Sequence, residues 1–441
     1  MNDAYHEALA LAIEHTAQPR IFRPRTNEEL FALFTADGES RRIAEARLCW
    51  DMYTGDQLRY IPRLPGESAL EFSRRPHKHF LNITRVVIDV LSQLYRRPVE
   101  RRASERIARV HARNPMDRLM LGVDRLARLH GVAAVCVSHE GDDVRYWPWP
   151  AHRMLVLPDA LRPDQPRAVI AFAAGDGSLA HVWDPQSFAT VAGGRVIREH
   201  AHSYGRVPFA FVHDRLPVDG FWVEGRGRSL AWANNEFNAK LSALAHTVAM
   251  QGFGVMEIVN PDPAQDIAVG PARAIRFHVS GNEPFGVNFK APGAPIADLI
   301  ADLEFLLRTL LKTQRVPESL LSIQPVSNLS GISILAQQTP VLEDRIERQQ
   351  VFRAFEHDLA EVTQAVLRAH EGPQPDAQFA LDYPEPELEQ SVAERIQADE
   401  FRLRHGMVTP WELMLRDNPD RYDSPEQARA AWETNVSKTT A

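Results

Sequence analysis

Any chemistry in this chain would have to come from a few short patterns. Two pairs of histidines are spaced by two residues, His77 with His79 and His200 with His202. This spacing places both imidazoles on one face of a strand, where a metal ion could bind. Neither pair has a third ligand identifiable from the sequence, so surface histidines are the favoured interpretation. We therefore predict no metal site and no cofactor.

The segment Gly225 to Ser229 reads GRGRS and superficially resembles a phosphate-binding loop. It lacks the Lys-Ser/Thr ending and the preceding strand that such a loop needs. A flexible start to a helix is the favoured interpretation. The GFG run from Gly252 to Gly254 is a weaker match still.

Four carboxylates on predicted helices could in principle form an acid/base or two-metal site; they are Asp298, Asp302, Glu343 and Asp344. Solvated helix faces are the favoured interpretation. Trp147 and Trp149 could stack on bases or peptides, but a packed turn is the simpler explanation. No Ser-His-Asp, Cys-His or zinc pattern stands out. We predict that the protein is not an enzyme.

The composition is that of an ordinary globular protein. The 441 residues are 44% hydrophobic and 24% charged, which allows two or three domains and a sizeable core. The net charge of -8 argues against a wide basic surface that grips phosphates.

Cys49 and Cys136 match no metal spacing and are expected to be buried thiols in a reducing compartment. The first residues do not resemble a secretory signal, and no apolar run reaches the roughly 18 residues of a membrane span, so neither export nor membrane insertion is expected.

The clearest element is an amphipathic helix that begins near Pro295. Its apolar residues recur at three- and four-residue steps along one stripe: Ile296, Leu299, Ile300, Leu303, Leu306, Leu307 and Leu310. Val316-Pro317 ends this helix, and the polar stretch from Ser322 to Gly331 predicts a flexible loop.

A second long helix is expected from about Ile332 to Ala369, kinked by Pro340. Its predicted apolar face consists of Phe352, Phe355, Leu359, Val362 and Val366, and its predicted wet face of Glu343, Asp344, Arg345, Glu347 and Arg348.

The preceding chain predicts helices, then strands, then a further helix. Helical spacing marks Ile83 to Leu94, with Asn82 or Thr84 as cap, and Leu119 to Leu129, which Gly131 ends. Short β-branched runs up to His200 predict one antiparallel sheet packed on these helices.

Ser229 to Met250 predicts another helix, and Val255 to Lys290 a small β-rich insertion. The tail predicts a helix to His405, a stop at Gly406 and two short helices capped near Thr409 and Ser424.

Several segments, taken in order, resemble the portal proteins of tailed double-stranded DNA bacteriophages, the head-to-tail connectors. The stretch RVPESLLSIQPVSNLSGISILAQQTPVLEDRIERQ resembles their tunnel-loop region. Trp50, Tyr53 and Gly55 followed by FLNITRVVIDVLSQLYRRP, and YGRVPFAFVHD from Tyr204 to Asp214, resemble parts of their wing. The resemblance covers most of residues 50 to 435; no one motif is diagnostic, but their order is.

The resemblance implies an α+β, mainly α portal fold with a wing of helices and antiparallel sheet, two stem helices, a β-rich clip and a helical crown. The implied parts are a wing at 1-224, a first stem helix at 225-252, a clip at 253-294, a second stem helix at 295-315, a tunnel loop at 316-331, a long kinked wing helix at 332-372 and a C-terminal crown at 373-441.

The resemblance also implies a function: a ring, with 12 subunits by resemblance, through which double-stranded DNA passes at one capsid vertex during packaging and ejection. The implied partners are the terminase large subunit, a head-completion or adaptor protein, and the major capsid and scaffold proteins. The protein would be assembled in the host cytoplasm and reside in the virion, with no membrane contact.

The implied sites are a DNA tunnel loop, a stem packing seam and clip contacts. They comprise Gln324, Ser327, Asn328 and Ser330 in the loop; Leu241, Leu244, Leu299, Leu303, Leu306 and Leu310 in the stem; and Arg273, Arg276 and Lys290 in the clip. The alternatives are a nucleic-acid-processing or nucleotide-using α+β enzyme, which would need a catalytic set not found here, and another capsid-associated minor head protein.

Overall fold

The computed structural model describes residues 37–64, 66–75, 78–141, 143–159, 161–173, 179–192, 195–218, 220–253, 255–259, 286–290, 295–317, 331–373, 378–385, 392–418, 421–422 and 424–439. The chain divides into two compact units. The larger contains Met1–Ile323 and Pro340–Pro384, and the smaller contains Gln324–Thr339 and Glu385–Ala441. Helices and antiparallel sheets together confirm the predicted α+β class.

The larger unit contains two stacked antiparallel sheets, so the prediction of one sheet is wrong. The first has the strand order β3-β2-β9, and the second the order β4-β5-β6-β7-β8. The strands are β2 (Val132–Glu140), β3 (Asp143–Pro150), β4 (Met154–Pro158), β5 (Pro166–Phe172), β6 (Leu179–Trp183), β7 (Ser187–Ala192), β8 (Arg195–Ala201) and β9 (Phe209–His213).

The central strand β2 explains the split, because both of its faces are buried. Val135 lies in a core shared with helices, while Ala134 lies in a core shared with β4 and β5 of the second sheet. Between the sheets the chain turns through the short 3-10 helix η3 (Ala151–Arg153). Arg42 from α3 (Asp37–Thr54) fastens this turn by donating to the carbonyl oxygens of Ala151 and Met154, at 3.0 and 2.7 Å. The turn ends one sheet and starts the next.

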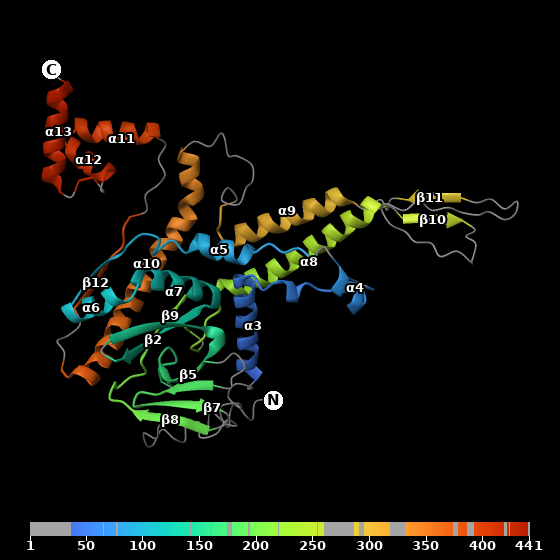
Figure 1. Ribbon diagram of the computed structural model, residues 1–441, viewed down its shortest axis with the longest axis horizontal. Helices are drawn as coiled ribbons and strands as arrows, with labels where there is room; N and C mark the ends of the chain where they lie inside the picture. The colour runs from blue at the N-terminus through green and yellow to red at the C-terminus, as the bar shows by residue number, and fades with distance from the viewer. Residues whose placement is uncertain are drawn as a thin grey trace. The chain divides into compact units, whose positions relative to one another are not determined.

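Two helices cover the outer face of the first sheet, α7 (Met116–His130) and α10 (Gly331–Glu371) (Figure 1). The apolar face predicted for the second long helix is buried against this sheet; it comprises Phe352, Phe355, Leu359, Val362 and Val366. Pro340 lies within α10 and marks the point where its residues pass from the smaller unit to the larger. The main core is therefore a layer of helices on a sheet.

Smaller elements complete this unit. The helix α5 (Ile83–Leu91) is capped by Asn82, whose side chain accepts a hydrogen bond from the Arg85 N–H. Asn82 is one of the two residues that were predicted as caps. The remaining elements are η2 (Leu58–Tyr60), α4 (Ala69–Arg74), β1 (Glu100–Ala103), α6 (Glu105–Arg113) and β12 (Phe379–Asp382). The pairing of β1 with β12 was not foreseen, since the two strands lie far apart in sequence.

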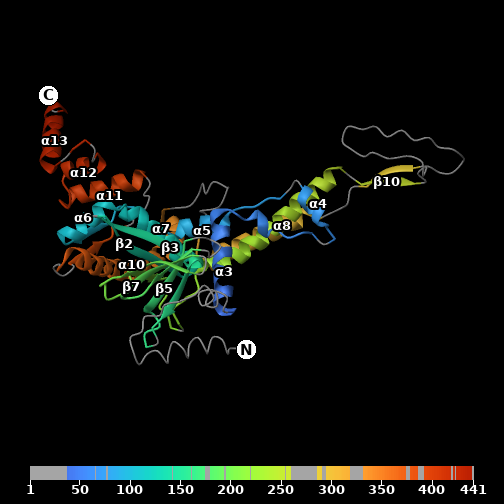
Figure 2. The same cartoon turned by 60° about the horizontal axis from the view of Figure 1, so that its bottom comes forward.

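Two helices leave this body side by side, α8 (Arg226–Phe253) and α9 (Ile296–Thr313) (Figures 1 and 2). They run in opposite directions, because the start of α8 meets the end of α9: Arg226 and Ser229 bond Gln314. Between their far ends lie β10 (Val255–Val259) and β11 (Gly286–Lys290), which pair antiparallel. We call α8 and α9 the stem.

The smaller unit contains the helices α11 (Val392–Arg404), α12 (Pro410–Asp417) and α13 (Pro425–Thr439). Gly406 has a φ of 67°, the left-handed conformation that ends helices, as its predicted role requires. Thr409 forms a capping box with Glu412 at the start of α12, and the Ser424 hydroxyl accepts from the Gln427 N–H at the start of α13. Both predicted caps are confirmed.

The GRGRS segment leads into a helix as predicted, since α8 begins at Arg226, but it is also a tight backbone crossing, which the prediction of a flexible segment did not include. A Cβ added to Gly225 would lie 2.2 Å from the Gly131 nitrogen, and one added to Gly227 would lie 2.2 Å from the Leu129 carbonyl oxygen. Gly131 itself has a φ of 84°. The glycines allow the end of α7 and the start of α8 to touch, because no side chain fits between them.

Replacing Gly227 with alanine is therefore expected to destabilise the protein by about 2–5 kcal/mol, since backbone atoms block the new methyl group. Gly122→Ala in α7 is the matched control, because nothing lies within 4 Å of its added Cβ and alanine favours a helix by about 0.5–1 kcal/mol. Urea unfolding followed by circular dichroism measures both. Equal midpoints for the two variants would contradict the crossing.

Candidate functional site

The stem has an apolar seam at its base. Leu303 and Leu310 of α9 are buried in a cluster with α3, α5 and α8, and Leu241, Leu244 and Leu306 pack against it. Leu299, the sixth residue proposed for this seam, is 37% exposed and lies outside the cluster. The structure thus brings five of the six stem leucines together near the body.

Several large apolar side chains of the stem face solvent in the single subunit. Trp232 of α8 is 59% exposed and Phe305 of α9 is 70% exposed. Leu299, Ile300 and Val248 are also exposed. Two exposed aromatic and three exposed aliphatic side chains on a helix pair are typical of a surface that another protein covers.

A polar ladder fastens α8 to the segment 79–84, which leads into α5. Asn234, Asn238 and Ser242 are spaced by four residues on one face of α8, and all three are at most 1% exposed. Their side-chain oxygens accept from backbone N–H groups of the segment at 2.8 to 3.1 Å. Asn234 and Ser242 also donate back to its carbonyl oxygens, at 2.8 and 2.9 Å. The ladder supplies partners to backbone groups of the non-helical residues His79 and Leu81 and to the Thr84 N–H in the first turn of α5, which has no partner within its own helix.

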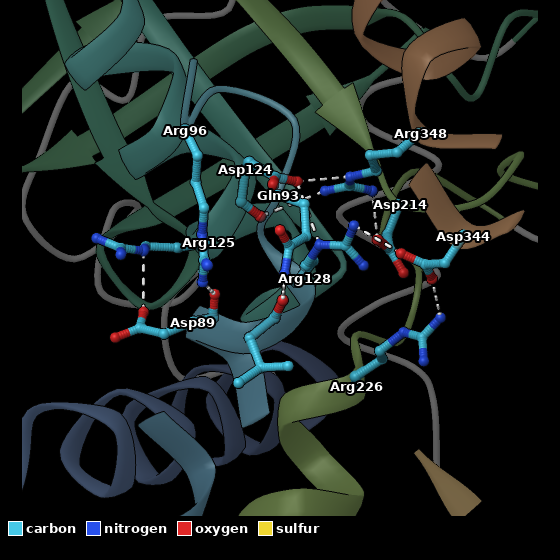
Figure 3. Close-up of polar contacts among 11 residues, drawn as sticks. Asp89, Gln93, Arg96, Asp124, Arg125, Arg128, Asp214, Arg226, Asp344 and Arg348 are labelled. Carbon is cyan, nitrogen blue, oxygen red and sulfur yellow. Dashed lines mark hydrogen bonds and ion pairs between the residues drawn. The ribbon is translucent and has the colours of Figure 1, made fainter. Parts of the chain in front are cut away.

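A buried network of arginines and aspartates lies where the stem joins the body (Figure 3). Its members come from α7, the end of β9, α8 and α10, and we call it the stem-base network: Asp124, Arg128, Asp214, Arg226, Asp344 and Arg348. Three positive and three negative groups balance one another. Burial is tolerable because each charge is paired.

Arg348 is the centre of one half of this network. Its Nε lies 2.6 Å from Asp124 Oδ1, and its Nη1 bonds Asp214. Asp344, one turn earlier on α10, is the centre of the other half. Its oxygens lie 2.7 Å from Arg128 Nη2 and 2.6 Å from Arg226 Nη2. One face of α10 therefore holds both the end of α7 and the start of the stem.

The electrostatic balance keeps the guanidinium groups charged. Burial alone would lower the pKa of Arg128, but the carboxylates of Asp124 and Asp344 outweigh it and raise that pKa. At Arg226 burial prevails over Asp344, so its pKa is lowered, yet from the high value of an arginine. Arg128 and Arg226 therefore stay charged at physiological pH.

The predicted wet face of the second long helix is therefore wrong in part. Asp344, Arg345 and Arg348 are all less than 9% exposed. The spacing of apolar residues along the helix assigned these three charged residues to the solvent face. A charged residue can nevertheless be buried when oppositely charged partners lie on other elements. One sequence signal was available: Asp124 with Arg128 and Asp344 with Arg348 are both Asp-Arg pairs at four-residue spacing. Asp302, by contrast, pairs with Lys240 across the exposed side of the stem.

A second buried carboxylate, that of Glu356, fixes α10 nearer to its C-terminal end. Glu356 is 1% exposed and accepts from the Tyr95 hydroxyl and from Arg101 Nε, both at 2.7 Å. Arg101 also donates to Asp117 at 2.6 Å. Burial and the charge of Glu356 raise the pKa of the Tyr95 hydroxyl, which therefore stays protonated and donates.

Other predicted site residues lie outside the described part. The tunnel-loop residues Gln324, Ser327, Asn328 and Ser330 are outside it, as are Arg273 and Arg276 of the clip, while Lys290 belongs to β11. Within the described residues no group of three metal-binding side chains occurs, and no helix there is long and apolar enough to cross a membrane.

The tryptophans and cysteines considered in the sequence analysis are held by packing and hydrogen bonds. Trp149 packs in the core between the two sheets, and the exposed Trp147 donates from Nε1 to Ser138 and Glu140. Cys49 and Cys136 are free and buried, as predicted. Burial raises the pKa of the Cys49 thiol to about 12, so it is protonated at neutral pH.

Replacing Arg348 with methionine is expected to destabilise the protein by about 3–5 kcal/mol, because Asp124 and Asp214 would remain buried without their cation. Arg41→Met is the matched control: Arg41 also pairs with a carboxylate, Glu45, but its side chain is 74% exposed, and such pairs contribute about 0–1 kcal/mol. Urea unfolding measures both. A loss for Arg348→Met no larger than for Arg41→Met would show that the network does not stabilise the fold.

Comparison with known proteins gives matches among solved structures. No protein-family model and no curated sequence matches the chain. One similar structure is described as "Virion of native gene transfer agent (GTA) particle", with 13% identity, a TM-score of 0.40, and coverage of 79% of this chain and 93% of that chain. Two others are described as "Neck of empty GTA particle computed with C6 symmetry" and "Neck of native GTA particle computed with C12 symmetry". Both are 13% identical over 75% of this chain and 87% of theirs, with TM-scores of 0.40 and 0.39.

Proposed function

We propose that this protein is a portal subunit of a tailed double-stranded DNA phage or a related particle. The observation that carries the proposal is the stem: two antiparallel helices, with the antiparallel strands β10 and β11 between their far ends, followed by the long helix α10. This is the order of parts that the sequence resemblance implies. The stem-base network suits such a part, because a strut that borders a channel must be held firmly at its root.

The proposed assembly is a closed ring of identical subunits, 12 by resemblance. A ring needs two different complementary surfaces on each subunit, repeated head to tail. The exposed apolar residues of the stem, above all Trp232 and Phe305, would supply part of one such surface. A neighbouring copy that covers them would remove from water the side chains that a lone subunit leaves exposed.

The ring would surround DNA in transit without gripping it. Serine, asparagine and glutamine side chains of the loop, at Gln324, Ser327, Asn328 and Ser330, can touch a sliding duplex but do not neutralise its phosphates. The net charge of -8 per chain, multiplied around a ring, would repel the DNA backbone. Both features favour passage over tight binding.

Partners would meet the proposed ring at its ends. Arg273, Arg276 and Lys290, in the proposed clip, are the suggested contacts for the terminase large subunit or for a head-completion or adaptor protein. The major capsid and scaffold proteins would contact the wing, and the site of action would be the portal vertex of the virion.

Replacing both Trp232 and Phe305 with serine is expected to shift the protein from rings to monomers, because each buried side chain of this size contributes about 1.5–3 kcal/mol per interface. Leu161→Ser is the control, since Leu161 is 92% exposed but lies outside the stem. Light scattering and negative-stain images report the particle mass and a central hole. Intact rings formed by the double variant would exclude this stem surface, and a wild-type monomer would exclude the portal.

Replacing Asn328 and Ser330 with lysine is expected to impair DNA passage more than ring assembly, because two added cations per subunit would bind phosphates. Asn328→Gln with Ser330→Thr is the matched control, which changes size without adding charge. Packaging of DNA into capsids and the mass of the ring are measured side by side. Equal packaging by the lysine and control variants would argue against placing this loop in the channel.

A further inference from the structure

Two stacked ring pairs, joined by a hydrogen bond, connect the end of α10 to the first sheet and to the loop before β9. The imidazoles of His139 and His370 lie face to face, with ring centroids 4.0 Å apart and planes 7° apart. The Tyr204 hydroxyl lies 2.9 Å from His370 Nε2, and the Tyr204 ring stacks on His202 at 4.0 Å and 18°. We call these four residues the histidine column.

The column joins elements that are distant in sequence. His139 lies near the end of β2, His370 lies in the last turn of α10, and His202 and Tyr204 lie between β8 and β9. Gly372 follows directly, with a φ of 88°, and ends the helix. The last turn of α10 is thus held to the sheet by ring contacts that include three histidine imidazoles.

We propose that the histidine column is an acid-sensitive latch, which holds the last turn of α10 against the sheet at neutral pH and releases it as the imidazoles become charged. Neutral rings stack favourably, whereas two imidazolium ions at this separation repel each other. Tyr204 keeps His370 in the stack while the ring is neutral.

Several charged groups of the described residues surround the column. Glu371, next to His370, pairs with Arg106 of α6. Glu140, next to His139, accepts from Ser138 and Trp147. The other titratable or charged groups near the column are Cys136 of β2, Asp184 beside His202, Arg206 of the loop with its partners Asp358 and Glu361 on α10, and Arg368 on α10.

The pKa values of His370 and His202 are shifted in the direction that an acid-sensitive latch requires, which is downward. Burial, followed by the charge of His139, lowers the pKa of His370 below its ordinary value, and burial lowers that of His202 although Asp184 opposes it. A histidine whose pKa is lower in the folded state stabilises the closed form above the ordinary value near 6.5. This contribution is lost as the pH falls below that value. The helix C-terminus alone would favour a charged His370, so burial, reinforced by the charge of the stacked His139, decides the sign.

The test is hydrogen exchange on the full-length protein in its native assembly. Exchange at the imidazole C2 position, followed by mass spectrometry, gives the pKa of His370 in the wild type, in His139→Gln and in the control His200→Gln, which changes an exposed histidine of β8. The latch predicts a pKa below about 6.5 in the wild type and in the control, and a higher pKa in His139→Gln.

Amide exchange of the last two turns of α10 gives the structural readout. After correction for intrinsic rates, protection in the wild type is expected to fall between about pH 7.5 and 5.5, the range around the ordinary histidine pKa. In His139→Gln this fall is expected to be smaller, because the charge of the stacked partner no longer opposes protonation of His370. A wild-type His370 pKa at or above its ordinary value, or the same fall in protection in His139→Gln, would overturn the proposal. Neither outcome depends on whether the protein forms a portal ring.

Discussion

The stem-base network is the interaction on which the rest of this structure depends. Asp344 and Arg348, one turn apart on α10, hold the end of α7, the end of β9 and the start of α8 in one place. An alternating set of charges is directional in a way that apolar packing is not, because each guanidinium fits its carboxylate in few geometries. The network therefore defines where the stem leaves the body as well as contributing to its stability.

Two further contacts make the stem a rigid extension of the body. The glycine crossing brings the backbones of α7 and α8 into direct contact, so α8 cannot shift sideways without a clash. The asparagine and serine ladder then fixes the rotation of α8, because its three polar side chains must face the segment 79–84. Position and rotation of α8 are thus set by different parts of its sequence.

The buried contacts of the stem contrast with the apolar side chains that the same helices expose to solvent. Leu303 and Leu310 pack within the subunit, whereas Leu299 and Phe305 on the same helix do not. One helix thus has two surfaces, an internal one that packs within the subunit and an external one that faces solvent. An oligomer would use this division directly, since the inner surface orients the strut and the outer one remains available to a neighbour.

The sequence by itself determined the long helices, the helix caps and the apolar face of α10, because periodicity and capping are local properties that adjacent residues encode. It also indicated the order of parts on which the portal proposal rests. Only the tertiary structure decided that the strands form two sheets, that GRGRS is a close crossing and that Asp344 and Arg348 are buried. Each depends on a partner far along the chain, as with Asp124 and Arg348, which are 224 residues apart. The type of a residue does not reveal such a partner, because burial of a charge depends on what the fold brings beside it.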